Sequence, residues 1–314
     1  MIEAVTRAGL AVNENIVIKK NRIIGSDSKN PSRKRVCIVT GIHGDELEGQ
    51  YVCAKLSSLL QNNLTLLNGT VDIYPALNPL GIDSITRGIP LFDLDMNRIF
   101  PGSPDGTMAE CLAADIIADI SGADICIDIH SSNIYLREIP QVRINEISAK
   151  DLIPYAKMLG CDFIWVHSSA TVLESTLAYS LNSIGTKTLV VEMGVGMRIT
   201  REYGDRLTEG ILNLLKNLEM WSGECKPPKE PIVSADRAVA FVNSGAAGIF
   251  VPTAEHWSEI HKGDAVGNVI DPVTGNIEEN VTSPCDGIIF TLREFPVVYG
   301  GSLIARILGG DANA

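Results

Sequence analysis

The sequence predicts an α/β fold with a largely parallel or mixed sheet and helices on both of its faces, followed by a small all-β domain. Two observations support this prediction. Between about residues 35 and 220, short runs rich in valine and isoleucine alternate with segments whose apolar residues recur at helical spacing. After residue 233 no long helical pattern remains, and short apolar runs are separated by glycines.

The expected strands of the α/β part are short and almost wholly apolar, as strands buried on both faces of a sheet usually are. Five segments have this character. They are residues 35–40 (RVCIVT), 69–77 (GTVDIYPAL), 123–130 (ADICIDIH), 162–167 (DFIWVH) and 187–194 (KTLVVEMG).

The expected helices lie between those strands. Residues 46–60, 108–120 and 205–218 each carry apolar residues at the spacing of one helix face. Thr107 is expected to cap the second of these helices, because a threonine hydroxyl can accept a hydrogen bond from the first helical turn.

The composition changes at residues 222–231 (SGECKPPKEP), where two adjacent prolines, lysines and a glycine are typical of a linker. Short strands punctuated by glycine follow, from about residue 233 to 310. We therefore predict an α/β domain in residues 1–230 and a β-rich domain in residues 231–314.

The bulk composition excludes several classes of partner. The chain has 314 residues, with 26 Lys or Arg against 38 Asp or Glu, so its formal net charge is −12. This balance offers no electrostatic footprint for nucleic acid or an anionic membrane, and no apolar run approaches the about 20 residues of a membrane helix.

Seven scattered cysteines favour reduced thiols over a disulfide framework. With no signal-peptide pattern, we expect a cytoplasmic protein.

The first candidate site residues are His43 and Glu46, in the stretch GIHGDELEG after the first expected strand. Imidazole and carboxylate are standard zinc ligands, and a catalytic zinc often has three protein ligands and a fourth position for water. His130 ends another expected strand, and the carboxyl ends of strands gather at one edge of an α/β sheet. Two interpretations are open. Either the three residues are part of one metal site, or His43 and Glu46 belong to an acidic surface turn and His130 is an unrelated capping histidine.

Further polar residues occur where chemistry would need them. Glu192 ends the apolar run TLVV, where a carboxylate is costly to bury; it could act as a general base on an activated water, or face solvent. Arg87, Asn97 and Arg98 lie in the segment RGIPLFDLDMNRIFPG. Arginine can hold a carboxylate with two parallel hydrogen bonds or stabilise a developing oxyanion. For any one of these three residues alone, a polar surface loop is the favoured interpretation.

The order of these residues, His-x-x-Glu, Arg, Asp-x-Asn-Arg, His and Glu, resembles the succinylglutamate desuccinylase/aspartoacylase family, which is related to the zinc carboxypeptidases. The resemblance covers nearly the whole chain, and its specificity comes from five weak motifs in the right order. It implies a carboxypeptidase-like mixed sheet with helices on both faces in residues 1–230, as the zinc hydrolase catalytic domain. Residues 231–314 would then form a barrel-sandwich-like β domain.

Residue by residue, the resemblance implies one zinc ion (Zn2+) per chain, with His43, Glu46 and His130 as its ligands. Glu192 matches the general base of the family. Arg87 matches the arginine that polarises the carbonyl of the substrate.

Four more positions match residues around that centre. Asn97 and Arg98 match the pair that grips a substrate carboxylate. Asp95 matches an acid that orients the first zinc histidine. Asp128 is either another acid of this kind or a simple strand-end residue. The implied activity is zinc-dependent hydrolysis of the amide bond of a small N-acyl amino acid or a related carboxylate-bearing amide.

Two alternative functions use the same residues. A zinc carboxypeptidase acting on short peptides is the first, and a non-catalytic, metal-containing binding protein is the second. The presence of every expected polar group, including the base, argues against the second. No His-Glu-x-x-His motif occurs, which excludes that class of metalloprotease. A homo-oligomer is an open expectation, since dimers are common.

The β-rich domain resembles lipoyl and biotinyl domains, which carry a modified lysine at a hairpin tip. No lysine follows Lys262, so cofactor attachment is not expected. By analogy with the family, this domain would instead narrow access to the active site.

Some residues receive no firm role. His167 could line the pocket, whereas His256 and His261 are expected at the surface or in the packing of the β domain. Residues 131–143 and 197–206 are expected to form loops. Four arginines in these segments could contact a second anionic group or simply be solvated, and we favour solvation. They are Arg137, Arg143, Arg198 and Arg201.

Overall fold

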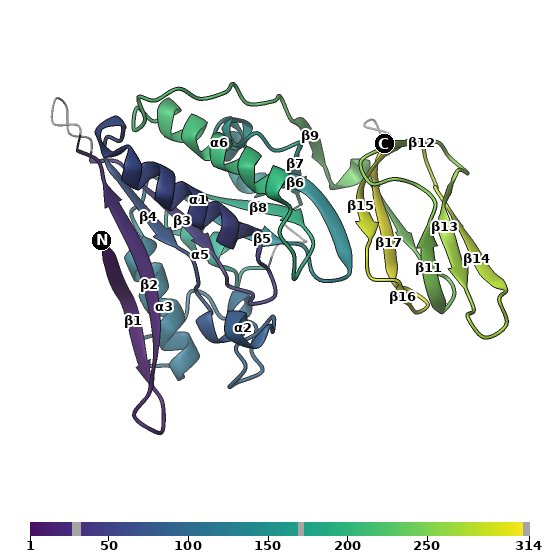
Figure 1. Cartoon of the computed structure of the whole chain (residues 1–314), viewed down its shortest axis with the longest axis horizontal. Coiled ribbons are helices and arrows are strands. Elements are labelled where there is room, and N and C mark those ends of the chain that lie inside the picture. The colour runs from purple at the N-terminus through teal and green to yellow at the C-terminus, as the bar shows by residue number, and fades with distance from the viewer. Residues whose placement is uncertain (27–32, 169–172, 310–314) are drawn as a thin grey trace.

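The structure of the protein is a computed structural model, and it describes residues 1–26, 33–168 and 173–309. Figure 1 shows an α/β body that contains the N-terminus and a β-rich region at the opposite end of the molecule. Among the described residues, no helix has the length and apolar character that crossing a membrane requires. All seven cysteines lie in the described ranges and are free.

Four parallel strands form the centre of the α/β body. β3 (Arg35–Thr40) pairs with β4 (Thr70–Tyr74) on one side and with β5 (Ile125–Ser131) on the other. β5 also pairs in parallel with β8 (Thr188–Gly194). These strands are nearly continuous apolar runs because helices cover both faces of the sheet.

Further strands extend this sheet on both sides. β2 (Asn15–Ile24) pairs antiparallel with β4, and β1 (Ile2–Gly9) forms the outer edge. On the other side, β6 (Leu136–Asn145) runs antiparallel to β8, and β7 (Phe163–His167) runs parallel to β6. The strand order across the body is therefore β1-β2-β4-β3-β5-β8-β6.

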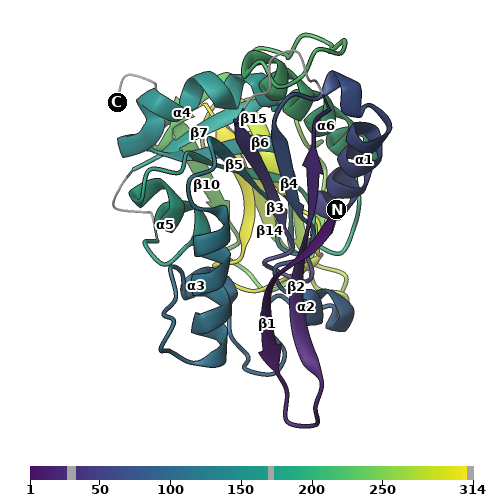
Figure 2. The same cartoon turned by 90° about the vertical axis from the view of Figure 1, so that its left-hand side faces the viewer.

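Helices cover the two faces of the sheet, as Figure 2 shows from the N-terminal end. α1 (Glu48–Asn62) and α6 (Arg201–Asn217) pack on one face, and α3 (Met108–Ile120) and α5 (Leu177–Ser183) pack on the other. α4 (Ala149–Ala156) contacts β6, β7 and β8. α2 (Pro79–Ser84) follows β4, and short 3₁₀ turns occur at Leu64–Leu66, Met96–Arg98, Glu146–Ser148, Lys157–Leu159 and Asp236–Ala238.

The predicted helices occur, with shifts at two of their starts. α3 begins where predicted, and Thr107 and Glu110 close a capping box around its first turn. α1 begins at Glu48 rather than at residue 46, because residues 43–46 form a turn in which Glu46 N donates to His43 O. α6 begins at Arg201 rather than at residue 205, because Thr200 already takes the N-cap position. The expectation of a loop at residues 197–206 is therefore wrong for residues 201–206.

The expectation of a loop at residues 131–143 is wrong, because Leu136–Asn145 forms β6. Pro140 and the charged residues around it are unusual in a strand with neighbours on both sides. The structure accommodates the proline where the register with β8 shifts, between Glu138 and Gln141. The expected strand at residues 69–77 is likewise too long, since β4 ends at Tyr74 before Pro75.

The β-rich region continues the large sheet. β15 (Gly287–Arg293) pairs antiparallel with β6, β17 (Leu303–Leu308) pairs with β15, and β10 (Val239–Asn243) pairs with β17. Of the two short strands that join this sheet, β9 (Ile232–Ala235) pairs with β7 and β12 (Glu259–Ile260) with β15. Strand pairing therefore crosses from the α/β body into the C-terminal part of the chain.

A second sheet lies against this extension. It contains β11 (Gly248–Pro252), β13 (Ala265–Ile270), β14 (Ile277–Thr282) and β16 (Val297–Val298). The two sheets enclose an apolar core that includes Phe250, Val266, Val269, Ile289 and Ile304. The predicted fold class is confirmed, with a mixed sheet, helices on both faces and a β-rich C-terminal region. The boundary at residues 230 and 231 stays a prediction.

Candidate active site

His43 and Glu46 lie in the turn that leads from β3 into α1. Two glycines allow this turn. Gly41 has φ +70°, in the left-handed region that favours glycine, and Gly44 packs directly against the backbone of Gly81. A Cβ atom on Gly44 would lie 1.9 Å from the carbonyl carbon of Gly81, so no larger residue fits without moving the turn.

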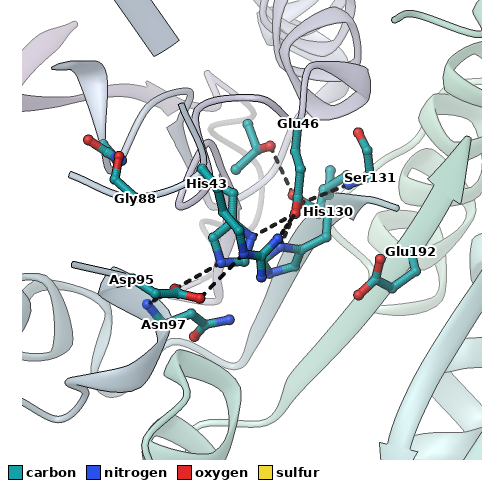
Figure 3. Close-up of polar contacts among 12 residues, drawn as sticks. His43, Glu46, Gly88, Asp95, Asn97, His130, Ser131 and Glu192 are labelled. Carbon is teal, nitrogen blue, oxygen red and sulfur yellow. Dashed lines mark hydrogen bonds and ion pairs between the residues drawn. The ribbon is translucent and has the colours of Figure 1, made fainter. Parts of the chain in front are cut away.

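His130, near the end of β5, meets this turn. Its Nδ1 lies 2.9 Å from Glu46 Oε2, and His43 Nδ1 lies 2.7 Å from Glu46 Oε1. Ser131 N donates to the same carboxylate at 3.1 Å. All three predicted ligands are buried, with exposed fractions of 3 to 5%. Figure 3 shows the two imidazoles on either side of the Glu46 carboxylate.

Two further carboxylates hold the other ring nitrogens. Asp95 Oδ1 lies 3.0 Å from His43 Nε2, and Asp128 Oδ2 lies 3.1 Å from His130 Nε2. Burial alone would lower the pKa of each imidazole, but the neighbouring carboxylates raise the pKa of both. Burial would conversely raise the pKa of Glu46, yet the two histidines hold it below its usual range. The negative charge around the rings therefore favours a cation at this place.

This donor set fits a zinc ion. Two imidazoles and one glutamate are a known ligand set of catalytic zinc, which leaves a further position for water. Each of the three residues offers one ligand atom, and these three atoms lie within 4.8 Å of one another in His43, Glu46 and His130. Each imidazole also has its second ring nitrogen against a carboxylate, the arrangement that usually orients metal-binding histidines. Asp128 thus faces His130 rather than solvent.

The residues of the segment before α3 lie beside this cluster. Arg87 Nη1 donates to Glu46 Oε1 at 2.9 Å, and its Nε lies 3.4 Å from Asp95 Oδ2. Asn97 Oδ1 accepts a hydrogen bond from Leu177 N, which leaves the NH2 group of this amide as a donor. Arg98 is 44% exposed and is the more accessible of the two arginines.

Glu192 comes from the strand next to that of His130. Its side chain is largely buried, at 16% exposure, and Arg143 Nη1 donates to its Oε1 at 3.1 Å. Burial raises the pKa of Glu192, although Arg143 opposes that shift. Figure 3 places this carboxylate apart from the cluster, to one side of His130.

All these side chains except Asp95 line one cavity of about 730 Å³. The volume is ample for a small metabolite. Asp95 lies behind His43, where it contacts the ring without lining the cavity. The structure therefore brings together all nine residues that the sequence suggested.

The cavity also contains residues that the sequence analysis missed or placed elsewhere. Arg143 contacts Glu138 and Glu192 in the cavity wall, so the expectation that it is solvated is wrong. Arg306, from β17, also lines the cavity. No local pattern marked Arg306, because its strand reaches the cavity only through long-range pairing with β15.

The remaining polar residues divide between the cavity and the surface. His167 lines the cavity, and its Nδ1 lies 3.1 Å from Asp236 Oδ1. Burial and Arg143 lower the pKa of His167 to about 4. The other histidines and arginines that the sequence analysis singled out do not line the cavity. His256 is bonded to Phe290 O, His261 and Arg201 are exposed, and Arg137 and Arg198 pair with Glu294.

Fold and site together define the class of this protein. It is an α/β protein with a buried centre of two histidines and one glutamate at the carboxyl edge of its sheet. The model of the succinylglutamate desuccinylase/aspartoacylase catalytic domain matches residues 32–218, which is more than half of the chain. The chain belongs to this family.

Individual relatives agree with this assignment. An N-alpha-acetyl-L-2,4-diaminobutyric acid deacetylase of Halomonas elongata is 27% identical over 278 residues, which cover 85% of this chain and 80% of that protein. A product-bound ectoine utilization protein of Ruegeria pomeroyi has a TM-score of 0.82 at 20% identity, covering 96% and 92% of the two chains. A succinylglutamate desuccinylase of Silicibacter sp. TM1040 has a TM-score of 0.85 at 19% identity, covering 98% and 94%.

Proposed function

We propose that the chain is a zinc-dependent deacylase, which hydrolyses the amide bond of a small N-acyl amino acid to a carboxylic acid and a free amino acid. Its family membership supports hydrolysis of this kind of bond. The relative from Halomonas elongata, named as a deacetylase of an N-acetylated diamino acid, supports this class of substrate.

The observation that carries the proposal is the convergence of His43, Glu46 and His130 on one buried point, in a cavity that the Glu192 carboxylate also lines. In the proposal these three residues would hold one zinc ion, which would supply Lewis-acid chemistry by lowering the pKa of water toward about 7 and polarising a carbonyl. Asp95 and Asp128 keep the two imidazoles oriented for binding, because each contacts the ring nitrogen that faces away from Glu46.

The chain's own side chains supply the proton transfers. Glu192 accepts a proton from the attacking water and returns it to the nitrogen of the leaving amine. Its raised pKa suits this role, since a carboxylate with a higher pKa is a stronger base for the water proton and holds that proton until the amine nitrogen can accept it. The mostly buried position also keeps bulk water from competing for the carboxylate.

Three other side chains bind and polarise the substrate. Arg87 has donors next to the cluster and stabilises the negative charge that develops on the carbonyl oxygen. Arg98 pairs with the substrate carboxylate, and the NH2 group of Asn97 donates to the same carboxylate. Both residues line the cavity that also contains Glu46, and the backbone of Leu177 at the start of α5 holds Asn97 there.

A substrate screen on the zinc-loaded chain tests this proposal. The panel contains N-acetyl, N-succinyl and other N-acyl amino acids beside dipeptides, and free amine is measured. Release from N-acyl amino acids and not from dipeptides is the expected result. Release from dipeptides alone would replace the proposal with a carboxypeptidase. A chain that binds zinc but hydrolyses neither class would be the non-catalytic binding protein.

A further inference from the structure

Four charged side chains form a continuous bridge in the cavity wall, which we call the Glu192 bridge. It runs from Glu192 on β8 through Arg143 and Glu138 on β6 to Arg306 on β17. Arg143 donates from Nη1 to Glu192 and from Nη2 to Glu138, at 3.1 and 3.3 Å. Arg306 Nη1 donates to the same oxygen of Glu138 at 2.6 Å.

Glu138 is the fixed point of the bridge. Its side chain is only 1% exposed, and both carboxylate oxygens are saturated. Oε1 accepts from Arg143 and Arg306, while Oε2 accepts from Gln141 Nε2 at 2.7 Å and from Thr291 Oγ1 at 2.6 Å. Four donors fill the roughly four lone-pair positions of a carboxylate, so each acceptor position of Glu138 is occupied.

The two arginines of the bridge share an aromatic surface. The guanidinium carbons of Arg143 and Arg306 lie 5.5 and 5.6 Å from the ring centroid of Trp165. Cations near an aromatic ring at this distance are attracted to it, most strongly when they are shielded from water. Both guanidinium groups are therefore restrained by Trp165 as well as by Glu138.

The sheet register explains why these groups meet. Glu138 on β6 is paired with Thr291 on β15, and Thr291 is paired with Arg306 on β17. Residues paired across neighbouring strands point to the same face of a sheet, so their side chains lie in one row. The C-terminal part of the chain therefore supplies two groups that contact Glu138.

We propose that Arg143 is a positioning residue that holds the Glu192 carboxylate in place, and that Arg306 of the β-rich region is needed for this because it completes the bridge. The inference rests on the proposed function, in which Glu192 is the general base. Among the described residues, Oε2 of Glu192 has no hydrogen-bonding partner, so one oxygen is held and the other is available for the proton. A displacement of about 1 Å in such a group can cost about 100-fold in rate.

The test compares Arg143→Gln and Arg306→Gln with Arg137→Gln. Arg137 is a matched control because it also lies on β6 and pairs with a carboxylate, that of Glu294, but lies outside the bridge. Zinc content and melting temperature are measured first. For the bridge variants we expect kcat to fall about 10- to 100-fold while KM and zinc content stay within about twofold of wild type. The control should keep the wild-type kcat.

A lysine variant separates position from charge. Arg143→Lys keeps the positive charge, but one ammonium group cannot reproduce the fork that joins two carboxylates. We therefore expect kcat to remain low in this variant. Full activity of Arg143→Lys would overturn the positioning role, and so would a raised KM with an unchanged kcat, which would make Arg143 a substrate-binding residue.

The outcomes also distinguish this inference from the proposed function. Equal kcat values for Arg143→Gln and Arg137→Gln on an N-acyl amino acid would overturn the bridge and leave the function standing. Hydrolysis of dipeptides alone by the wild type would overturn the function, and the same comparison on dipeptides would still decide on the bridge. A zinc-loaded wild type that hydrolyses neither class would overturn both. Should Arg143→Gln fail to fold, Arg306→Gln carries the comparison.

Discussion

His130 on β5 and Glu192 on β8 are paired residues in the parallel register of the central sheet. Paired residues on neighbouring strands point to the same face, so the imidazole and the carboxylate project from one face of the sheet. Strand pairing thus brings His130 and Glu192 into one row, with Gln141 of β6 as the next residue in it.

The first prediction concerns metal content. We expect about one zinc ion per chain in the wild type and loss of the metal in both His43→Ala and His130→Ala, since three protein ligands are needed to hold catalytic zinc. Elemental analysis after gel filtration in zinc-containing buffer is the measurement. His261→Ala is the matched control, because this imidazole is 78% exposed and far from the cluster in sequence. Zinc retained by both of the first two variants would exclude the proposed ligand set.

The second prediction concerns the general base. Glu192→Gln keeps the size and the buried position of the side chain but cannot accept a proton. We expect kcat to fall by about 100- to 10,000-fold with zinc content unchanged. Steady-state kinetics on the best substrate of the panel, with zinc analysis of the same preparation, checks this. Unchanged turnover would remove Glu192 from the mechanism.

The third prediction concerns the acids behind the histidines. Asp95→Asn and Asp128→Asn remove a negative charge beside His43 and His130 while preserving shape. We expect each to weaken zinc affinity by about 10- to 100-fold, as loss of such partners does in other zinc sites. Competition titration against a chelator of known affinity is the measurement. Wild-type affinity in both variants would mean that these carboxylates do not orient the rings.

The fourth prediction concerns the pH dependence of stability. His167 has a folded-state pKa of about 4, below its ordinary value of about 6.5. As pH falls from about 6.5 to 4, the unfolded chain binds a proton that the folded chain does not. This residue therefore lowers the free energy of unfolding by up to about 1.4 kcal/mol per pH unit over that range.

Urea unfolding of wild type and His167→Gln between pH 7 and 4 measures this contribution. The variant should lose less stability than the wild type as the pH is lowered, because glutamine does not titrate. Parallel curves for the two proteins over this range would contradict the lowered pKa of His167.

The fifth prediction concerns the turn that carries His43 and Glu46. Gly44→Ala would place a Cβ atom against the backbone of Gly81, so the turn must move. We expect the variant to fold with lower stability and to bind zinc at least about 10-fold more weakly. Gly9→Ala is the control, because nothing lies within 4 Å of its Cβ position. Zinc affinity and melting temperature should be unchanged in that control.

The sequence alone was sufficient for the alternation of strands and helices and for the order of the site residues. Both are local properties. The apolar runs of β3, β5 and β8 reflect burial on both faces, and His43, His130 and Glu192 each stand at the end of one such run. A capping threonine is equally local, and Thr107 therefore marked the start of α3 correctly.

Only the tertiary structure decided how distant segments combine. β6 contains a proline and charged residues, and it is stable as a strand because β8 and β15 pair with its two sides. Arg306 enters the cavity because β17 is joined to β6 through β15, and Arg143 is held in the cavity wall by Glu138 and Glu192. A buried charge requires partners from several strands, and strand pairing between residues far apart in sequence depends on the whole fold rather than on any local pattern.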